Sequence, residues 1–227
     1  VVVPDLVGFG KSDKPSEKED YTYARHITWV SELLFDSLNL SNITFFGQDW
    51  GGLIGLRLVA ASPERFSRVV IGNTGLPTGD GPLSSAFMAW QKFSQESPHF
   101  DIGKIVGGGC VSDFSEEVTS AYNAPFPDDT YKAGARIFPS LVPTTPDNPE
   151  SKNNQEAWEV LKRFEKPFLT CFSDSDPVTK GGEGAFIGRV SGTENQQHVT
   201  IEDAGHFLQE DKGPELAEII NEFISRN

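Results

Sequence analysis

The chain has 227 residues, 37% of them hydrophobic and 23% charged, which fits one globular domain with room for an insertion. Its 33 acidic and 19 basic residues give a formal net charge of -14. A surface this negative repels phosphate backbones and anionic lipid, so it argues against nucleic-acid or membrane partners and favours a small neutral substrate.

The chain opens on residues 1–3, three valines that predict a buried core strand ended by Pro4. It has no initiating Met and no signal-like segment, so we expect a fragment that lacks its own N-terminus. No apolar run approaches the roughly 20 residues that a transmembrane helix needs. The compartment is unknown from the sequence, and a soluble cytoplasmic protein is our expectation.

The elements that follow alternate between helices and short apolar strands. Apolar residues at helical spacing predict an amphipathic helix over residues 23–40 and a second helix over residues 53–61. A C-terminal helix is predicted from an apolar stripe of Leu216, Ile219, Ile220, Phe223 and Ile224. Strands are predicted at residues 43–46, 68–73, 166–173 and 198–203.

Most of these strands are apolar on both faces, which indicates a mostly parallel α/β sheet flanked by helices. Residues 77–164 differ, because they are rich in proline, glycine and aromatic residues and carry only short helical pieces. We interpret this stretch as a mainly helical cap inserted between two parts of one α/β core, residues 1–76 and residues 165–227.

The two cysteines, Cys110 and Cys171, are too few and too far apart for a disulfide framework or a metal site. Cys171 lies in an apolar run, so we expect a buried thiol there. The sequence "VGGGC" that ends at Cys110 falls in the predicted cap and is interpreted as a flexible turn.

The segment Gly-Gln-Asp-Trp-Gly, from Gly47 to Gly51, has the form of a nucleophile elbow with Asp49 at its centre. The flanking glycines permit a strained turn between strand and helix, which presents the central side chain at the sheet edge. The following helix points its N-terminus toward the site and favours an anion there. A simple helix-capping aspartate is the alternative interpretation, and Gly52 behind the motif favours the elbow.

Two further groups follow later strands. Asp174 and Asp176 come directly after the strand predicted to end at residue 173, and His206 follows the strand after that. Taken singly, Asp174 or Asp176 can be interpreted as a turn residue, and His206 as a structural histidine. The order nucleophile, acid, histidine is the one that α/β-hydrolases use, so we expect Asp49, one of Asp174 and Asp176, and His206 to form a catalytic triad.

An aspartate at the elbow favours a different chemistry from a serine. A carboxylate with a reference pKa near ~4 is ionised at neutral pH and can displace a leaving group from sp³ carbon, giving an alkyl ester. Water activated by a histidine can then hydrolyse that ester. Cleavage of a carbon–halogen bond or of an epoxide ring is therefore expected.

The two substrates need different help for the leaving group. A departing halide needs N–H donors, and the indole N–H is a donor only, so Trp50 beside the nucleophile and Trp90 in the cap suit halide. An epoxide oxygen needs a proton, for which the cap offers Tyr122 and Tyr131. Core packing is the alternative role for all four aromatic residues.

The chain also resembles the haloalkane dehalogenases of the α/β-hydrolase superfamily over nearly its whole length. The matching segments are "PDLVGFGKSDKP" from Pro4, "GQDWGG" from Gly47, "AFMAW" from Ala86, "APFPDDTYKAGARIFPSLVP" from Ala124 and "DAGHFLQED" from Asp203. The most specific are Gln48 before the nucleophile and the block from Ala124.

This resemblance implies the α/β-hydrolase fold and hydrolysis of a haloalkane to an alcohol and halide, with no cofactor and no metal. It implies a monomer that binds a small neutral halogenated substrate and water. It assigns the triad acid to Asp176, since the alternative position in related enzymes corresponds to Asn73, an amide. The halide role falls on Trp50 and Trp90, and the pocket lining on Phe87, Phe138 and Pro139.

The chain departs from the family in one respect. The family has a His-Gly-x-Pro-type segment after an early strand, which supplies an oxyanion-hole N–H, and that segment and the first strands are missing here. Loss of one oxyanion donor costs roughly 10²–10³ in rate. An epoxide hydrolase and a truncated, catalytically inactive hydrolase-fold protein therefore remain as alternatives.

Overall fold

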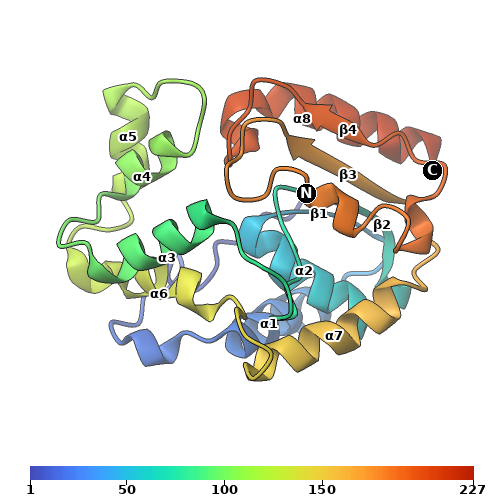
Figure 1. The fold of residues 1–227 in the computed structure, drawn as a ribbon, viewed down its shortest axis with the longest axis horizontal. Coiled ribbons are helices and arrows are strands. Elements are labelled where there is room, and N and C mark those ends of the chain that lie inside the picture. The colour runs from blue at the N-terminus through green and yellow to red at the C-terminus, as the bar shows by residue number, and fades with distance from the viewer.

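The computed structural model describes all 227 residues and is built around one sheet of four parallel strands (Figure 1). Each strand pairs with the one that precedes it in the chain, in the order β1-β2-β3-β4. β3 is buried along its whole length, which accounts for its continuous apolar sequence. The strands are β1 Ile43–Gln48, β2 Phe66–Gly72, β3 Phe168–Ser173 and β4 Val199–Ile201.

Helices cover both faces of the sheet. In Figure 1, α8 lies on one side, and α1, α2 and α7 lie on the other, where the larger hydrophobic cluster is. The bounds are α1 Tyr23–Ser31, α2 Asp49–Ala61, α7 Pro149–Leu161 and α8 Leu208–Arg226. A turn of π-helix, Glu32–Ser37, follows α1, and the remaining single turns are Lys18–Asp20, Pro63–Arg65, Gly182–Ala185 and Ser191–Thr193.

Four short helices form a separate group at one end of the sheet, where α3 packs against α6 and α4 against α5 (Figure 1). Their bounds are α3 Ser85–Glu96, α4 Ile102–Gly108, α5 Glu116–Asn123 and α6 Ala133–Leu141, with a single turn Asp129–Lys132 before α6. The division into residues 1–76, 77–164 and 165–227 stays a prediction, and from here on "cap" means only the four short helices α3 to α6 with the segments that join them. Within the middle stretch, α7 packs against α2 rather than with the four short helices.

Capping side chains set where several helices begin. The side-chain oxygens of Thr22, Ser84, Asp101 and Ser115 each accept a hydrogen bond from the backbone N–H three residues later, and Asn148 accepts from Glu150. Such a cap satisfies a donor that has no partner inside the helix and contributes about 1 kcal/mol. These five helices therefore each begin after a polar residue whose side chain caps the first turn.

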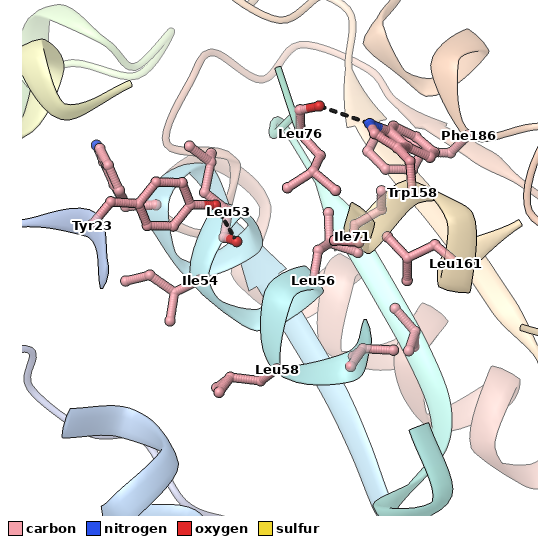
Figure 2. Packing of buried hydrophobic residues seen from close by; sticks show 14 of the residues in the cluster. Tyr23, Leu53, Ile54, Leu56, Leu58, Ile71, Leu76, Trp158, Leu161 and Phe186 are labelled. Atoms are coloured by element: carbon pink, nitrogen blue, oxygen red, sulfur yellow. Dashed lines mark hydrogen bonds between the residues drawn. The ribbon is translucent and has the colours of Figure 1, made fainter. Parts of the chain in front are cut away.

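Two aromatic side chains fix the segments that follow the carboxyl ends of β1 and β2. The Tyr23 hydroxyl donates to the backbone carbonyl of Leu53 in α2 at 2.7 Å, and Trp158 Nε1 donates to the carbonyl of Leu76 at 2.8 Å (Figure 2). Both acceptors belong to the buried cluster, so these bonds satisfy backbone groups that water cannot reach. They hold α2 and the loop after β2 in fixed positions.

The predicted strands and helices are confirmed with shifted ends, and two further expectations, on residues 1–3 and on the glycines before Cys110, are wrong. Residues 1–3 lie exposed and pair with no strand, because apolar sequence alone does not supply a hydrogen-bonding neighbour. The helix after β1 begins at Asp49, four residues earlier than predicted. Gly107 and Gly108 belong to the last turn of α4 rather than to a flexible turn. Cys171 is fully buried, as predicted.

No helix is both long enough and apolar enough to cross a bilayer.

Candidate active site

Asp49 occupies a strained turn between β1 and α2. Its φ is +46°, in the left-handed region that few residues other than glycine adopt. The Asp49 N–H donates to the carbonyl of Asn73 at 3.0 Å, and the Asp49 carbonyl accepts from Thr74 Oγ1 at 2.7 Å. Both partners follow β2, so the neighbouring strand's end holds the strained turn in place.

The glycines around Asp49 are not equivalent. A Cβ atom on Gly47 would lie 2.9 Å from the Gly51 carbonyl oxygen, and one on Gly52 would lie 2.2 Å from Thr74 Oγ1. A Cβ on Gly51 would meet nothing within 4 Å. The close approach of helix and loop therefore requires Gly47 and Gly52, and the second glycine of the motif itself is sterically free.

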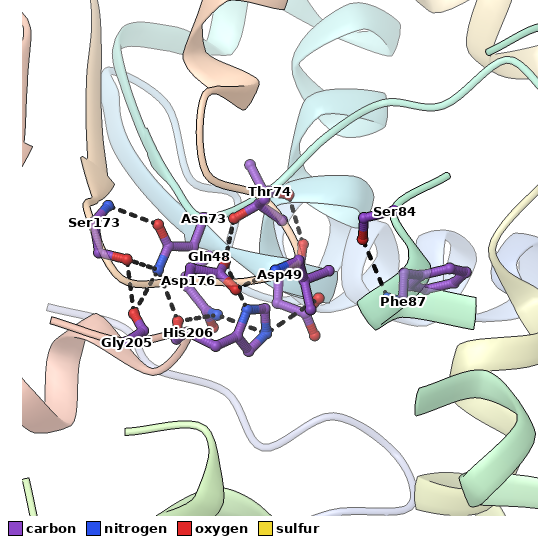
Figure 3. Close-up of polar contacts among 12 residues, drawn as sticks. Gln48, Asp49, Asn73, Thr74, Ser84, Phe87, Ser173, Asp176, Gly205 and His206 are labelled. Atoms are coloured by element: carbon purple, nitrogen blue, oxygen red, sulfur yellow. Dashed lines mark hydrogen bonds and ion pairs between the residues drawn. The ribbon is translucent and has the colours of Figure 1, made fainter. Parts of the chain in front are cut away.

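The three predicted triad residues lie together (Figure 3). His206 Nδ1 lies 3.0 Å from Asp176 Oδ2, and His206 Nε2 lies 3.7 Å from Asp49 Oδ1. With its proton on Nδ1, the imidazole donates to Asp176 and directs the lone pair of Nε2 toward Asp49. The nearby Asp174 accepts from Ser175 and is not bonded to His206, so the geometry favours Asp176 as the triad acid.

Asp176 is held as an anion. Its side chain is 0% exposed, and it accepts from Val178 N–H at 2.8 Å and from the Thr179 hydroxyl in addition to His206. Burial acts to raise the pKa of Asp176, but the hydrogen bonds and the positive charge of His206 outweigh it, and the pKa lies below its ordinary value. A charged partner for the imidazole is therefore maintained.

The pKa values of His206 and Asp49 are shifted the other way, above their ordinary values. Burial acts to lower the pKa of His206, but the hydrogen bond to Asp176 and the charges of Asp49 and Asp176 raise that pKa above its ordinary value. Desolvation raises the pKa of Asp49, while His206 and the backbone N–H of Trp50 oppose that shift. The Asp49 side chain keeps 43% of its surface exposed, which is what a nucleophile that must meet a substrate requires.

Asn73 links the three parts of the site, a role that sequence reasoning missed. The fully buried Asn73 Nδ2 lies 2.8–2.9 Å from Ser173 Oγ and from the carbonyls of Gly205 and His206 (Figure 3). Its Oδ1 accepts from the Ser173 N–H at 2.9 Å, and its carbonyl accepts from Asp49. The signals in the sequence were a polar residue at the end of a predicted strand and its place at the alternative acid position of related enzymes.

Gln48 makes a second contact to the histidine loop. Its Nε2 donates to the His206 carbonyl at 3.0 Å and lies 3.3 Å from His206 Nε2. The residue before the nucleophile therefore contacts both the backbone and the ring of the histidine.

A cavity of about 680 Å³ opens beside Asp49. Its walls include Leu53 and Thr74 near the elbow, and Phe87 and Val142 from the cap side. This volume suits a small organic molecule. No three His, Cys, Asp or Glu side chains are grouped so as to hold a metal ion.

The remaining predicted residues lie in two places. Trp50, the residue after Asp49, is 8% exposed and packs edge-on against Phe138, with the ring centroids 4.7 Å apart. Trp90 stacks on two cap phenylalanines, and the carbonyl of Pro139 accepts from Gln91. Of these residues, Phe87 lines the cavity beside Asp49, and Phe138 contacts Trp50. The aromatic contacts of Trp90 and the hydrogen bond of Pro139 join cap residues to one another.

Comparison with known proteins gives a consistent result. The family model for the alpha/beta hydrolase fold matches residues 1–213. A haloalkane dehalogenase from Psychrobacter cryohalolentis is 56% identical over 227 residues, covering 100% of this chain and 75% of that protein. One from Mycolicibacterium paratuberculosis is 50% identical over 220 residues, covering 97% of this chain and 72% of that protein.

Among solved structures, the tetrameric haloalkane dehalogenase DpaA from Paraglaciecola agarilytica superposes with a TM-score of 0.88 at 29% identity, covering 98% of this chain and 72% of that one. With 56% identity to a haloalkane dehalogenase over its full length, the chain belongs to the haloalkane dehalogenase family of the α/β-hydrolase fold.

Proposed function

We propose that this protein hydrolyses the carbon–halogen bond of small haloalkanes to give an alcohol, a halide ion and a proton. The observation that carries the proposal is the position of the His206 ring between the buried Asp176 and the partly exposed elbow carboxylate of Asp49. The acid, base and nucleophile are thereby assigned to Asp176, His206 and Asp49.

In the first step, an Asp49 carboxylate oxygen attacks the carbon that bears the halogen. A carbon–oxygen bond forms, the carbon–halogen bond breaks, and the electron pair leaves with the halide. No proton moves in this step, so His206 is not needed for it. The left-handed backbone of Asp49 at the start of α2 holds the carboxylate toward the cavity.

In the second step, His206 Nε2 takes a proton from water as the water oxygen adds to the carbonyl carbon of the Asp49 ester. The tetrahedral intermediate collapses, the alcohol leaves with the proton from His206, and the Asp49 acid returns its proton to solvent. The Asp176 carboxylate stabilises the imidazolium that forms between these events, at 3.0 Å from Nδ1.

The proposal assigns the halide to the indole N–H groups of Trp50 and Trp90. Trp158 donates to a backbone carbonyl, whereas neither Trp50 nor Trp90 donates to any acceptor within the protein, so both remain available to an anion. Lys180 and Arg189 also line the cavity beside Asp49, which adds positive charge near an anionic product in a chain of net charge -14.

The epoxide alternative has less support. The Tyr122 hydroxyl donates to Glu210 on α8, and Tyr131 is 41% exposed in the turn before α6. Neither tyrosine lines the cavity that contains Asp49, and neither do Trp50 and Trp90, so what counts against the epoxide alternative is that the Tyr122 hydroxyl already donates to Glu210. A catalytically inactive hydrolase-fold protein is the remaining alternative, and a halide-release assay with a set of bromoalkanes tests it directly.

The expectation of a monomer stays a prediction. The relative from Paraglaciecola agarilytica is described as a tetramer. Sedimentation at several protein concentrations distinguishes the two states.

Trp90→Phe is expected to lower dehalogenation by about one to two orders of magnitude. It keeps most of the ring volume but removes an N–H donor, and a hydrogen bond to a charged group contributes roughly 1.5–3 kcal/mol. Rates are measured on a bromoalkane and a matched epoxide, and bromide binding by quenching of tryptophan fluorescence. Tyr131→Phe serves as the control and is expected to change neither rate.

Epoxide turnover that survives Trp90→Phe but collapses in Tyr122→Phe or Tyr131→Phe would replace the dehalogenase proposal with an epoxide hydrolase.

The His206 imidazole of the substrate-free enzyme is expected to lose its proton at a pH above 6.5, the ordinary pKa of histidine. The hydrogen bond to Asp176 and the charges of Asp49 and Asp176 raise its pKa. Asp176→Asn removes a charge and a hydrogen bond that raise this pKa, so the midpoint should move to lower pH while the rate of ester hydrolysis drops. NMR titration of the imidazole in the substrate-free enzyme measures the midpoint, and an unmoved midpoint would exclude Asp176 as the partner.

A further inference from the structure

The cap touches the backbone of the catalytic histidine directly. The carbonyl of Gly109, which follows α4, accepts from the His206 N–H at 2.7 Å and from the Phe207 N–H at 3.4 Å. A Cβ atom on Gly205 would lie 2.3 Å from that same carbonyl oxygen. The turn after α4 and the loop that carries His206 therefore pack backbone against backbone.

One carboxylate joins the two segments from the other side. Asp211, in the first turns of α8, accepts at Oδ2 from the N–H groups of Gly205 at 2.8 Å and Val111 at 2.9 Å. Its Oδ1 accepts from the N–H of Ser112 at 2.9 Å and from the Ser112 hydroxyl. Such charge-assisted bonds are stronger than neutral ones, so a single side chain fixes the cap turn relative to the residue before His206.

We propose that Asp211 is a positioning residue for the hydrolytic step, which couples the cap turn 109–112 to the His206 loop and so sets the alignment of the imidazole. The inference rests on the proposed function, in which His206 acts on water and not on the haloalkane. Without Asp211, the N–H groups of Gly205, Val111 and Ser112 lose their acceptor. The orientation of the His206 ring then loses one of its restraints.

The expected defect is confined to one step. Attack by Asp49 needs no base, so the formation of the ester and the release of halide should proceed normally. Breakdown of the ester needs His206 Nε2 aimed at water, and a misplacement near 1 Å can cost roughly 10²-fold. The variant Asp211→Ala is therefore expected to slow ester breakdown by about 10- to 100-fold and to leave kcat/KM unchanged.

Glu210→Ala is the matched control. Glu210 is the adjacent acid in the same turn of α8, and it also contacts the cap, through the Tyr122 hydroxyl. Its side chain makes no hydrogen bond to the His206 loop; only its backbone N–H, which the substitution keeps, donates to the Phe207 carbonyl. Both variants remove one negative charge and a link between α8 and the cap, through three hydrogen bonds for Asp211 and one for Glu210. Only Asp211→Ala also removes the bond to the histidine loop, at Gly205.

The experiment mixes excess enzyme with a bromoalkane, quenches at intervals, and follows the ester on Asp49 by intact mass and the bromide separately. Asp211→Ala should release bromide at the wild-type rate and then hold the ester for longer, whereas Glu210→Ala should match the wild type. Asp211→Asn, which keeps the shape of the side chain and one acceptor oxygen, is expected to fall between them and replaces the alanine variant if that one does not fold.

Each outcome decides a different point. If the wild type releases no bromide, the proposed function fails and the inference with it. If the wild type turns over and the ester in Asp211→Ala decays at the wild-type rate, only the inference is overturned. A parallel loss of kcat and kcat/KM, or an equal defect in Glu210→Ala, would assign Asp211 to general stability and also overturn it.

Discussion

Asp49→Asn is expected to abolish halide release, with a loss on the order of 10⁴-fold or more, as removal of a covalent nucleophile causes in other hydrolases. The neutral amide is a poor nucleophile toward sp³ carbon, and no other carboxylate in the triad faces the cavity. The substitution should not disturb the fold, because Asn adopts a left-handed backbone as readily as Asp. Asn73 already does so at φ +40°.

The measurement is bromide release from freshly prepared, mass-verified Asp49→Asn protein. Freshness matters because slow deamidation would regenerate the aspartate and return activity with time. Asp174→Asn is the control, since Asp174 follows the same strand as Asp176 but accepts only from Ser175 and from the backbone of Asp203 and Ala204. Normal turnover by the verified Asp49→Asn protein would remove Asp49 from the role of nucleophile.

The sequence predicts those features that depend on local pattern. Apolar runs locate all four strands, and glycines beside an aspartate predict the elbow, because both signals lie within a few residues of one another. The order of Asp49, Asp176 and His206 along the chain predicts their meeting, since the carboxyl ends of parallel strands share one edge of the sheet. The structure brings these three side chains within hydrogen-bonding or ion-pair reach.

Features that join distant segments are not predictable in this way. The bonds of Asn73 to the histidine loop span more than 130 residues of chain, and the contact from Gly109 to His206 depends on how the cap packs. The choice between Asp174 and Asp176 depends on the direction of two side chains in one short loop, which the letters Asp-Ser-Asp do not encode. Residues 1–3 have strand-like composition, but pairing requires a neighbour as well.

The same limit applies to the elbow glycines. The elbow motif calls for glycine at both 47 and 51. In the structure, a Cβ atom on Gly51 would meet nothing, whereas one on Gly52 would clash with Thr74. That clash exists because Thr74 donates to the Asp49 carbonyl from the end of the adjacent strand. The steric requirement is therefore a property of the packing between β2 and α2, and only its outcome, a third glycine, is visible in the sequence.

His206→Phe is expected to stop turnover after one halide per active site and to trap the ester on Asp49. Phenylalanine keeps a flat ring against Phe207, which the histidine contacts edge-on at 4.9 Å, but it offers no base. The fully buried Asp176 loses its imidazole partner and keeps Val178 N–H and the Thr179 hydroxyl, so its pKa should rise and the melting temperature should drop without loss of the fold.

Intact-mass analysis of His206→Phe after addition of a bromoalkane should show one added alkyl group, located by peptide mapping to the segment that contains Asp49. His99→Phe is the control: His99 is exposed on the cap and should leave turnover unchanged. The wild type supplies a second test, because a single turnover in heavy-oxygen water should place the label in the Asp49 carboxylate and not in the alcohol. Label found first in the alcohol would mean that water attacks the haloalkane directly. In that case His206→Phe should block bromide release itself, and no ester would form in either protein.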